Sequence, residues 1–266
     1  MQKFHEERRS KLGAVLDSER WRTAETSPDV QSAIDSFLAE GCPPPQSAAN
    51  TRDAVVVNGE AYVVVGAAMF FLPLMLEYCG CVNSLPTAAP DLLTRLVELL
   101  KTFNSRTCQL VLGAGALPLV GLKTISSRNL ALASRSLQLV VFFIPFLKVH
   151  FEERLPAKQK TMVKHFDQAH KDFGDHIAEI ENKLICLLSD MAEHALSSWE
   201  IKPPVPSAAF RAITKQMAKF HEAINPIWPE QHVQLFYTRF NVSLKEQLRK
   251  QIAKRRVLKN GGPQHG

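Results

Sequence analysis

The chain has 266 residues, of which 45% are hydrophobic, and its formal net charge at pH 7 is +6. This length and apolar content are sufficient for a sizeable core, so the composition excludes a disordered tail. The mild positive excess favours anionic partners but is too small to require a nucleic acid.

The N-terminal part is predicted to form a helix followed by a linker. Charged residues separate the apolar residues of segment 1–22, as in an amphipathic helix, and we interpret this segment as the end of a preceding helical region. Residues 23–54 include the run GCPPPQSAAN at 41–50, which predicts a flexible linker, interrupted by a helical turn at Val30–Leu38. Residues 55–266 are expected to form one C-terminal helical rod domain.

A small β-hairpin is predicted near residues 54–65. Asn58 and Gly59 are flanked on both sides by β-branched residues, which is the pattern of a two-residue turn between antiparallel strands. The sheet would have two strands, because the residues that follow carry helical patterns.

The segment Ala61–Leu76 has sixteen residues without a charge and is the most membrane-like part of the sequence. A helix that crosses a bilayer needs about 20 apolar residues, and Pro73 is expected to interrupt this one. The sequence therefore favours a buried core helix over a transmembrane span.

Five helical stretches follow the hairpin. Pro90 and Pro156 suit first helical positions, whereas Ser127 and Ser207 suit N-caps. Each stretch has one apolar side to bury, so the predicted fold class is all-α, with antiparallel bundles or a stacked rod. The stretches are 65–82, 90–112, 127–154, 156–197, and the broken pair 207–225 and 229–257.

The clearest periodic pattern lies in the fourth stretch. Nine apolar residues follow one another there at an average spacing of about 3.6 residues, the period of a straight bundle helix. An uninterrupted helix from Pro156 to Ser197 would be roughly 60 Å long, and a surface of that length is typical of proteins that bind other macromolecules. The nine residues are Met162, Phe166, Ala169, Phe173, Ile177, Ile180, Leu184, Leu187 and Met191.

Sequence motifs of common enzymes are missing or have the wrong spacing. In segment 113–124 five residues separate two glycines and no lysine directly follows the second, whereas a phosphate-binding Walker loop needs four residues and an immediate lysine. Asp167 and His170 have the spacing of half a di-metal site, but no matching second half is found. We therefore predict no enzyme activity, no catalytic residue, no cofactor and no metal site.

The C-terminal stretch predicts a surface for an anionic partner, either a lipid or an acidic protein. Its apolar face, from Val233 to Ile252, is expected to be buried up to about Ile252, and the alternative for the basic residues beyond it is a solvated tail. Aromatic residues are missing from Lys245 onward, which excludes base stacking and argues against a nucleic acid. The candidate basic residues are Lys245, Arg249, Lys250, Lys254, Arg255, Arg256 and Lys259.

Long, irregular blocks of the sequence carry a family resemblance that spans nearly the whole chain. They include FHEERRSKLGAVL at 4–16, LTRLVELLKTFNSR at 93–106 and CQLVLGAGAL at 108–117, and further blocks lie at 121–125, 129–132, 176–180, 204–207 and 261–264. The chain resembles the C-terminal part of the vacuolar protein sorting-associated protein fifty-four family. Members of this family are subunits of the Golgi-associated retrograde protein (GARP) tethering complex.

The resemblance implies a non-catalytic subunit built as an elongated rod of stacked helical bundles. It implies retrograde transport from endosomes to the trans-Golgi network, on the cytosolic face of that membrane, with this region contributing to vesicle or membrane capture. The family's partners are the other tethering subunits, SNAREs, small Rab GTPases and endosome-derived vesicles. The N-terminal coiled coils that assemble the subunits, and the family's last helical segment, are expected to be missing here. The alternative is a peripheral lipid-binding helical protein that acts through its basic C-terminal helix.

Overall fold

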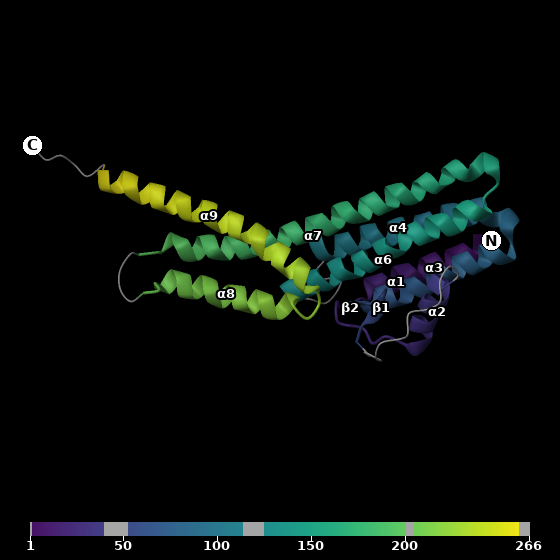
Figure 1. Ribbon diagram of the computed structural model, residues 1–266, viewed down its shortest axis with the longest axis horizontal. Helices are drawn as coiled ribbons and strands as arrows, with labels where there is room; N and C mark the ends of the chain where they lie inside the picture. The colour runs from purple at the N-terminus through teal and green to yellow at the C-terminus, as the bar shows by residue number, and fades with distance from the viewer. Residues whose placement is uncertain (1, 40–52, 114–124, 201–204, 261–266) are drawn as a thin grey trace, which may run out of the picture. The chain divides into compact units, whose positions relative to one another are not determined.

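The computed structural model describes residues 2–39, 53–113, 125–200 and 205–260, with side chains described up to residue 254 (Figure 1). Within these residues there are eight α-helices and a two-stranded antiparallel sheet, so the all-α prediction is confirmed. The elements are α1 (Gln2–Asp17), α2 (Pro28–Ala39), β1 (Val55–Val57), β2 (Glu60–Tyr62), α3 (Gly66–Ser84), α4 (Ala89–Leu112), α6 (Ser127–Arg154), α7 (Lys164–Ser197), α8 (Ala208–Ile224) and α9 (Glu230–Asn260), with 3₁₀ turns η1 (Pro86–Ala88) and η2 (Ala157–Val163).

Contacts divide the chain into two compact units, Met1–Ile180 and Glu181–Gly266. The division falls inside α7, whose first part belongs to unit 1 and whose second part belongs to unit 2. The boundaries expected from the sequence, at residues 22/23 and 54/55, stay predictions and do not coincide with this division. Within the expected linker, α2 forms a longer helix than the predicted turn, while 40–52 lies outside the described residues.

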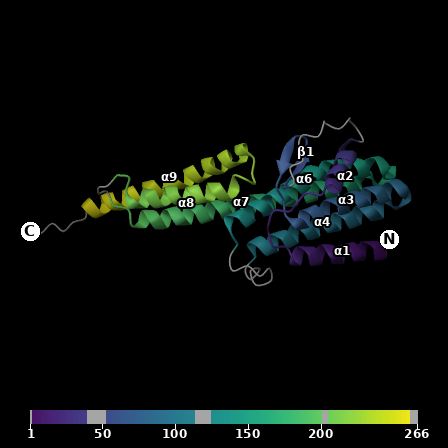
Figure 2. The ribbon, with the colours of Figure 1, turned by 90° about the horizontal axis from the view of Figure 1, so that it is seen from below.

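Unit 1 is a helical bundle around α3, α4 and α6. Helix α1 packs against α3 and α4, and α2 packs against α3, as the two ribbon views agree (Figures 1 and 2). At the centre, the rings of Phe71 and Phe103 are stacked with centroids 4.6 Å apart, and Phe173 of α7 stacks on Phe103 at 6.4 Å. These rings join α3, α4 and α7 because each helix directs the aromatic residue of its apolar stripe to the same core.

Helix α1 is held by a buried histidine as well as by apolar contacts. His5 is 1% exposed, with Nδ1 2.8 Å from the Tyr78 hydroxyl of α3 and Nε2 3.1 Å from Glu98 Oε2 of α4. Leu12 and Leu16, about two and three turns further on, are fully buried. The first predicted amphipathic helix is therefore part of the unit 1 bundle.

The predicted hairpin is confirmed, with Val55 paired to Tyr62 and Val57 paired to Glu60. Asn58 and Gly59 both adopt a positive φ, 50° and 79°, as a two-residue turn of this kind requires. Arg135 of α6 fastens the hairpin to the bundle. Its Nη2 donates to Glu60 Oε1 and to the Ala61 carbonyl at 2.7 Å each, and its guanidinium lies 3.8 Å from the Tyr62 ring centroid.

Helix α3 continues through Pro73, so the expected interruption there is wrong. The proline removes one backbone hydrogen bond, and the burial of its neighbours Leu72 and Leu74 in the bundle offsets that loss. By length and apolar composition α3 and α6 could each cross a membrane, but 50% and 72% of their most apolar windows are buried in the structure. The expectation of no transmembrane span stays a prediction.

Two helix starts differ from the sequence prediction. The N-cap of α6 is Ser126 rather than Ser127, because Ser126 and Asn129 form a reciprocal capping box in which the Asn129 backbone N–H donates to Ser126 Oγ at 3.2 Å. Helix α7 begins at Lys164 rather than Pro156. The intervening residues form the 3₁₀ turn η2, whose first bond runs from the Gln159 N–H to the Pro156 carbonyl at 2.8 Å.

Unit 2 is a helical bundle of the second part of α7 with α8 and α9. In the first part of α7 the spacing between successive buried apolar residues includes both three and four residues. From Ile180 onward the spacing is always four residues. Each step of four turns the buried face by about 40°, so the face drifts around the helix. As a result Leu187 is half-buried and Met191 is 37% exposed, although both were expected in the apolar stripe. Ile180 and Leu184 are buried as predicted, and beyond them the buried apolar residues are Leu188, Ala192 and Leu196.

The protein's three tyrosines predict a delayed phenol titration. Burial raises the pKa of Tyr237 to about 12, and burial is also the main cause of the raised pKa of Tyr62 and of Tyr78. In the unfolded chain the tyrosine pKa is 10.0, whereas in the folded protein burial disfavours the ionised phenol. The contribution of the buried neutral phenol to the free energy of unfolding is therefore complete below pH 10 and is lost as the pH rises above 10. Absorbance at 295 nm should show tyrosine ionisation delayed to higher pH in the folded protein than in the unfolded chain. In strong denaturant all three tyrosines should titrate together near pH 10. A titration curve of the folded protein identical to that in denaturant would contradict the burial of the tyrosines.

Candidate anionic-partner surface

Helix α9 is fixed in unit 2 by an inner face that is apolar at its start and polar further along. Val233, Phe236 and Phe240 are at most 4% exposed. Further along, the Ser243 and Ser189 hydroxyls lie 2.9 Å apart, and Gln247 Nε2 donates to the Ser189 carbonyl of α7 at 3.0 Å. Apolar burial therefore weakens earlier than expected.

The end of the apolar stripe confirms this change. Leu244 and Leu248 are half-buried, and Ile252 is 42% exposed, so the expectation that burial extends to about Ile252 is wrong. The reason is that polar contacts to α7, rather than apolar side chains, occupy the inner face beyond Phe240.

Two contacts with Glu181 of α7 orient the first half of α9. His232 Nε2 lies 3.0 Å from Glu181 Oε1, and Arg239 Nη1 lies 3.6 Å from Glu181 Oε2. Glu181 is only 14% exposed, so it links two turns of α9 to α7. Because Arg239 is paired in this way, its charge is partly neutralised.

The predicted basic residues do not share one face of α9. At about 100° per residue, Lys254 lies five turns beyond Phe236 and therefore on the inner side, whereas Lys245 and Arg249 lie on the opposite, outer side. The side chains of these three basic residues and of Lys250 are exposed. The side chains of Arg255, Arg256 and Lys259 lie outside the described residues.

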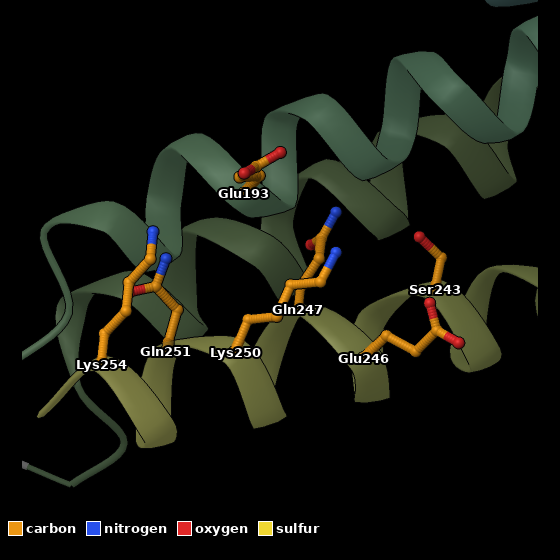
Figure 3. Close-up of a pocket in the computed structure, with 7 residues that line it drawn as sticks. All are labelled: Glu193, Ser243, Glu246, Gln247, Lys250, Gln251 and Lys254. Atoms are coloured by element: carbon orange, nitrogen blue, oxygen red, sulfur yellow. The ribbon is translucent and has the colours of Figure 1, made fainter. Parts of the chain in front are cut away.

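Lys250 and Lys254 lie beside carboxylates. Together with Glu193 of α7 and Glu246 they line a small cavity of about 140 Å³, whose other lining residues are Ser243, Gln247 and Gln251 (Figure 3). Figure 3 shows Lys250 and Lys254 extending from α9 toward α7. Two cations and two carboxylates around one hollow largely cancel, so this side of α9 is poorly suited to attract an anion over a distance.

The outer side of α9 carries exposed apolar residues that the sequence analysis did not single out. Leu235 and Val242 are each 58% exposed and lie seven residues apart, on the same side as Lys245 and Arg249. Their spacing was the available signal, but the stronger stripe from Val233 to Phe240 dominated the pattern.

A wider hollow of about 800 Å³ lies between α8 and α9 and was not expected from the sequence. Trp228, Val233 and Tyr237 supply its apolar surface, and His221, Asn225 and Asn241 supply polar groups. The Tyr237 hydroxyl donates to the Met217 carbonyl at 3.0 Å, which fixes the ring against α8. The hollow therefore offers apolar contacts and hydrogen-bonding groups. Among its described lining residues, Glu230 is the one that carries a carboxylate.

The sequence argued against two sites, a di-metal site at Asp167 and His170 and a phosphate-binding loop at 113–124. Asp167 accepts hydrogen bonds from Lys148 Nζ at 2.7 and 2.9 Å, which gives this carboxylate an ion pair within unit 1. In the described part of the chain no three potential metal ligands form a group. Of the glycine segment 113–124, only Gly113 lies within the described residues.

The fold defines the class of protein: an all-α protein built from helical bundles. A family model described as Vps54-like protein matches residues 59–191. Two similar curated relatives are vacuolar protein sorting-associated protein 54 of Mus musculus, 49% identical over 99% of this chain, and of Drosophila melanogaster, 38% identical over 100% of this chain. The chain belongs to the Vps54 family.

The match is to one part of longer proteins. This chain spans about 28% of the length of the curated relatives that it matches. A solved structure described as Vps54 C-terminal domain is 46% identical, with a TM-score of 0.33, and the match covers 40% of this chain and 75% of that one.

Proposed function

We propose that this chain is a non-catalytic part of a vesicle-tethering subunit that acts in retrograde transport from endosomes to the trans-Golgi network. The observation that carries the proposal is the match, over nearly the whole chain, to relatives named for vacuolar protein sorting. The two helical bundles support it, because they offer long outer faces for protein contacts. The GARP complex is the tethering complex proposed for this role.

The proposed division of labour places vesicle or membrane capture on this chain. Other subunits would be held mainly by regions that lie outside it, while SNAREs, small Rab GTPases and endosome-derived vesicles are the proposed partners. The proposed location is the cytosolic face of the trans-Golgi network. The surface that supports capture is the exposed outer side of α9, with Lys245 and Arg249.

A pull-down from cell extract with the immobilised chain tests this proposal. We expect endosomal cargo on the beads and no enrichment of sister subunits. Two matched variants test which charges matter: Lys245→Glu with Arg249→Glu on the outer side, and Lys250→Glu with Lys254→Glu beside the carboxylates. The outer pair should lose most of the captured cargo and the inner pair should keep it.

The control for this pull-down is helicity by circular dichroism, which should be equal in all variants because all four side chains are exposed. Robust recovery of the sister subunits without any vesicle marker would overturn the proposed division of labour.

The second candidate function is peripheral lipid binding through α9. The observation behind it is the exposure of Leu235 and Val242, because exposed apolar side chains on a basic helix are a feature of interfacial helices. Co-sedimentation with vesicles containing phosphatidylserine at two salt concentrations tests it. A simple electrostatic binder loses affinity steeply with salt, whereas capture through a protein receptor does not require the lipid.

A further inference from the structure

The exposed apolar residues of α9 lie in one regular stripe. Among the residues of α9 whose side chains the structure describes, up to 254, the exposed large apolar ones are Leu235, Val242 and Ile252, at 58%, 58% and 42%. Thr238, Lys245 and Arg249 fill the positions between them, and they are also exposed. The six residues are separated by steps of 3, 4, 3, 4 and 3. We call Leu235, Thr238, Val242, Lys245, Arg249 and Ile252 the outer stripe.

Steps that alternate between three and four have a mean of 3.5 residues, the period of a seam between two packed helices. Over its length the outer stripe stays within about 100° of the helix circumference. It is separate from the inner face, where Val233, Phe236 and Phe240 are buried. Helix α9 therefore has two seams, of which the outer one is uncovered within the described residues.

We propose that the outer stripe binds an α-helix of another protein, one with apolar residues at its own seam and acidic residues opposite Lys245 and Arg249. Charge complementarity favours an acidic partner, because Lys245 and Arg249 lie in the outer stripe about one helical turn apart. Arg239 is committed to Glu181, and Lys250 and Lys254 face Glu193 and Glu246 around the small cavity. The charge available to a partner on this side is thus that of Lys245 and Arg249.

The order of residues in the outer stripe favours a helix over a membrane. Lys245 and Arg249 lie between Val242 and Ile252 in the same line, so a helix lying in a bilayer would carry two charges into its apolar side. Interfacial helices instead place basic residues at the flanks, from which they reach the headgroups. A partner helix meets the same two cations with two carboxylates.

A second copy of this chain is also disfavoured by charge. Pairing two outer stripes in parallel would bring Lys245 and Arg249 of one copy opposite those of the other, and like charges at a seam oppose association. Pairing them antiparallel would leave the two cations of each copy opposite Val242 and Thr238, with no carboxylate to meet them. The proposed partner is therefore a different helix. The inference rests on the proposed function for its biological setting, whereas its test measures binding alone.

The test uses a designed helical probe of about 28 residues, four heptads, with Leu at the seam positions opposite Leu235, Val242 and Ile252 and Glu at the seam positions opposite Lys245 and Arg249. Fluorescence anisotropy measures its binding to the whole chain at low salt. We expect Lys245→Glu with Arg249→Glu to weaken binding about tenfold, since two attractive pairs become repulsive. A second probe with Lys in place of Glu should bind this double variant and not the original chain. Such a charge swap is not expected from general loss of structure.

Two matched variants complete the design. Lys250→Glu with Lys254→Glu changes charge by the same amount on the inner side and should keep the affinity within about twofold. Leu235→Ser with Val242→Ser should weaken binding of the first probe about tenfold while leaving the melting temperature unchanged, because both side chains are exposed. Equal loss in the inner and outer charge variants would overturn the proposal by showing nonspecific attraction.

Two further measurements decide between occupants. Binding to phosphatidylserine vesicles that the outer charge variant abolishes, together with no probe binding, would replace the proposed helix by a membrane. Dimers in sedimentation equilibrium that Leu235→Ser with Val242→Ser dissociates would replace it by a second copy. A monomer that binds the acidic probe and responds to the charge swap supports the proposal. Failure here would leave the pull-down result intact, so the two proposals fail separately.

Discussion

Leu184→Asp is expected to lower the free energy of unfolding of unit 2 by about 5 kcal/mol, which is enough to unfold a typical domain. Leu184 is fully buried on α7 in the drifting stripe, and a carboxylate there loses both the apolar contacts and its hydration. Thermal melting by circular dichroism measures the loss. Hydrogen exchange should show it first in 181–254.

The matched control is Met191→Asp, seven residues further along the same helix. Met191 is 37% exposed, so a carboxylate there stays hydrated and the melting temperature should change little. The sequence placed both residues in one apolar stripe, and the structure separates them. Equal melting of the two variants would contradict the drift of the buried face.

Phe103→Ala is expected to destabilise unit 1 by about 4 kcal/mol, the usual cost of removing a fully buried aromatic ring. Phe103 is 1% exposed, and its ring is stacked with the rings of Phe71 and Phe173, with centroids 4.6 and 6.4 Å away. Its removal leaves a cavity where α3, α4 and α7 meet. Urea unfolding followed by circular dichroism measures the change.

Phe146→Ala provides the comparison for this variant. Phe146 on α6 is 40% exposed, so its removal should cost less than about 1 kcal/mol. A large loss from Phe146→Ala, or a small one from Phe103→Ala, would contradict the placement of the core between α3, α4 and α7.

Most of the secondary structure could be predicted from local sequence. Asn58 and Gly59 between β-branched residues predicted the hairpin, because their backbone angles are set within the turn itself. The predicted stretch 127–154 has the same bounds as α6. These bounds could be predicted because the apolar periodicity that defines the helix is a property of the local sequence. Where local competition decided the outcome, as between Ser126 and Ser127 for the cap, the prediction was wrong by one residue.

The candidate surface could be predicted only as a list of charges. Counting placed seven basic residues near the C-terminus, but a charge count does not say which side of α9 each one occupies or what lies opposite. Glu193 is 57 residues before Lys250 in sequence and lines the same small cavity. That neighbourhood changes the electrostatics of Lys250 and Lys254, and no spacing rule within α9 reveals it.

The sequence by itself determined the helical class, the hairpin and the family, because periodicity, turn residues and long irregular blocks are all properties of the linear chain. Only the tertiary structure decided which side of each helix is buried. The drift that exposes Met191, and the separation of Lys245 and Arg249 from Lys250 and Lys254, both depend on which helices pack alongside. The physical reason is that an apolar stripe in the sequence shows only approximately which side of a helix is buried. Contacts with residues distant in the sequence decide which residues at the edges of that stripe are covered.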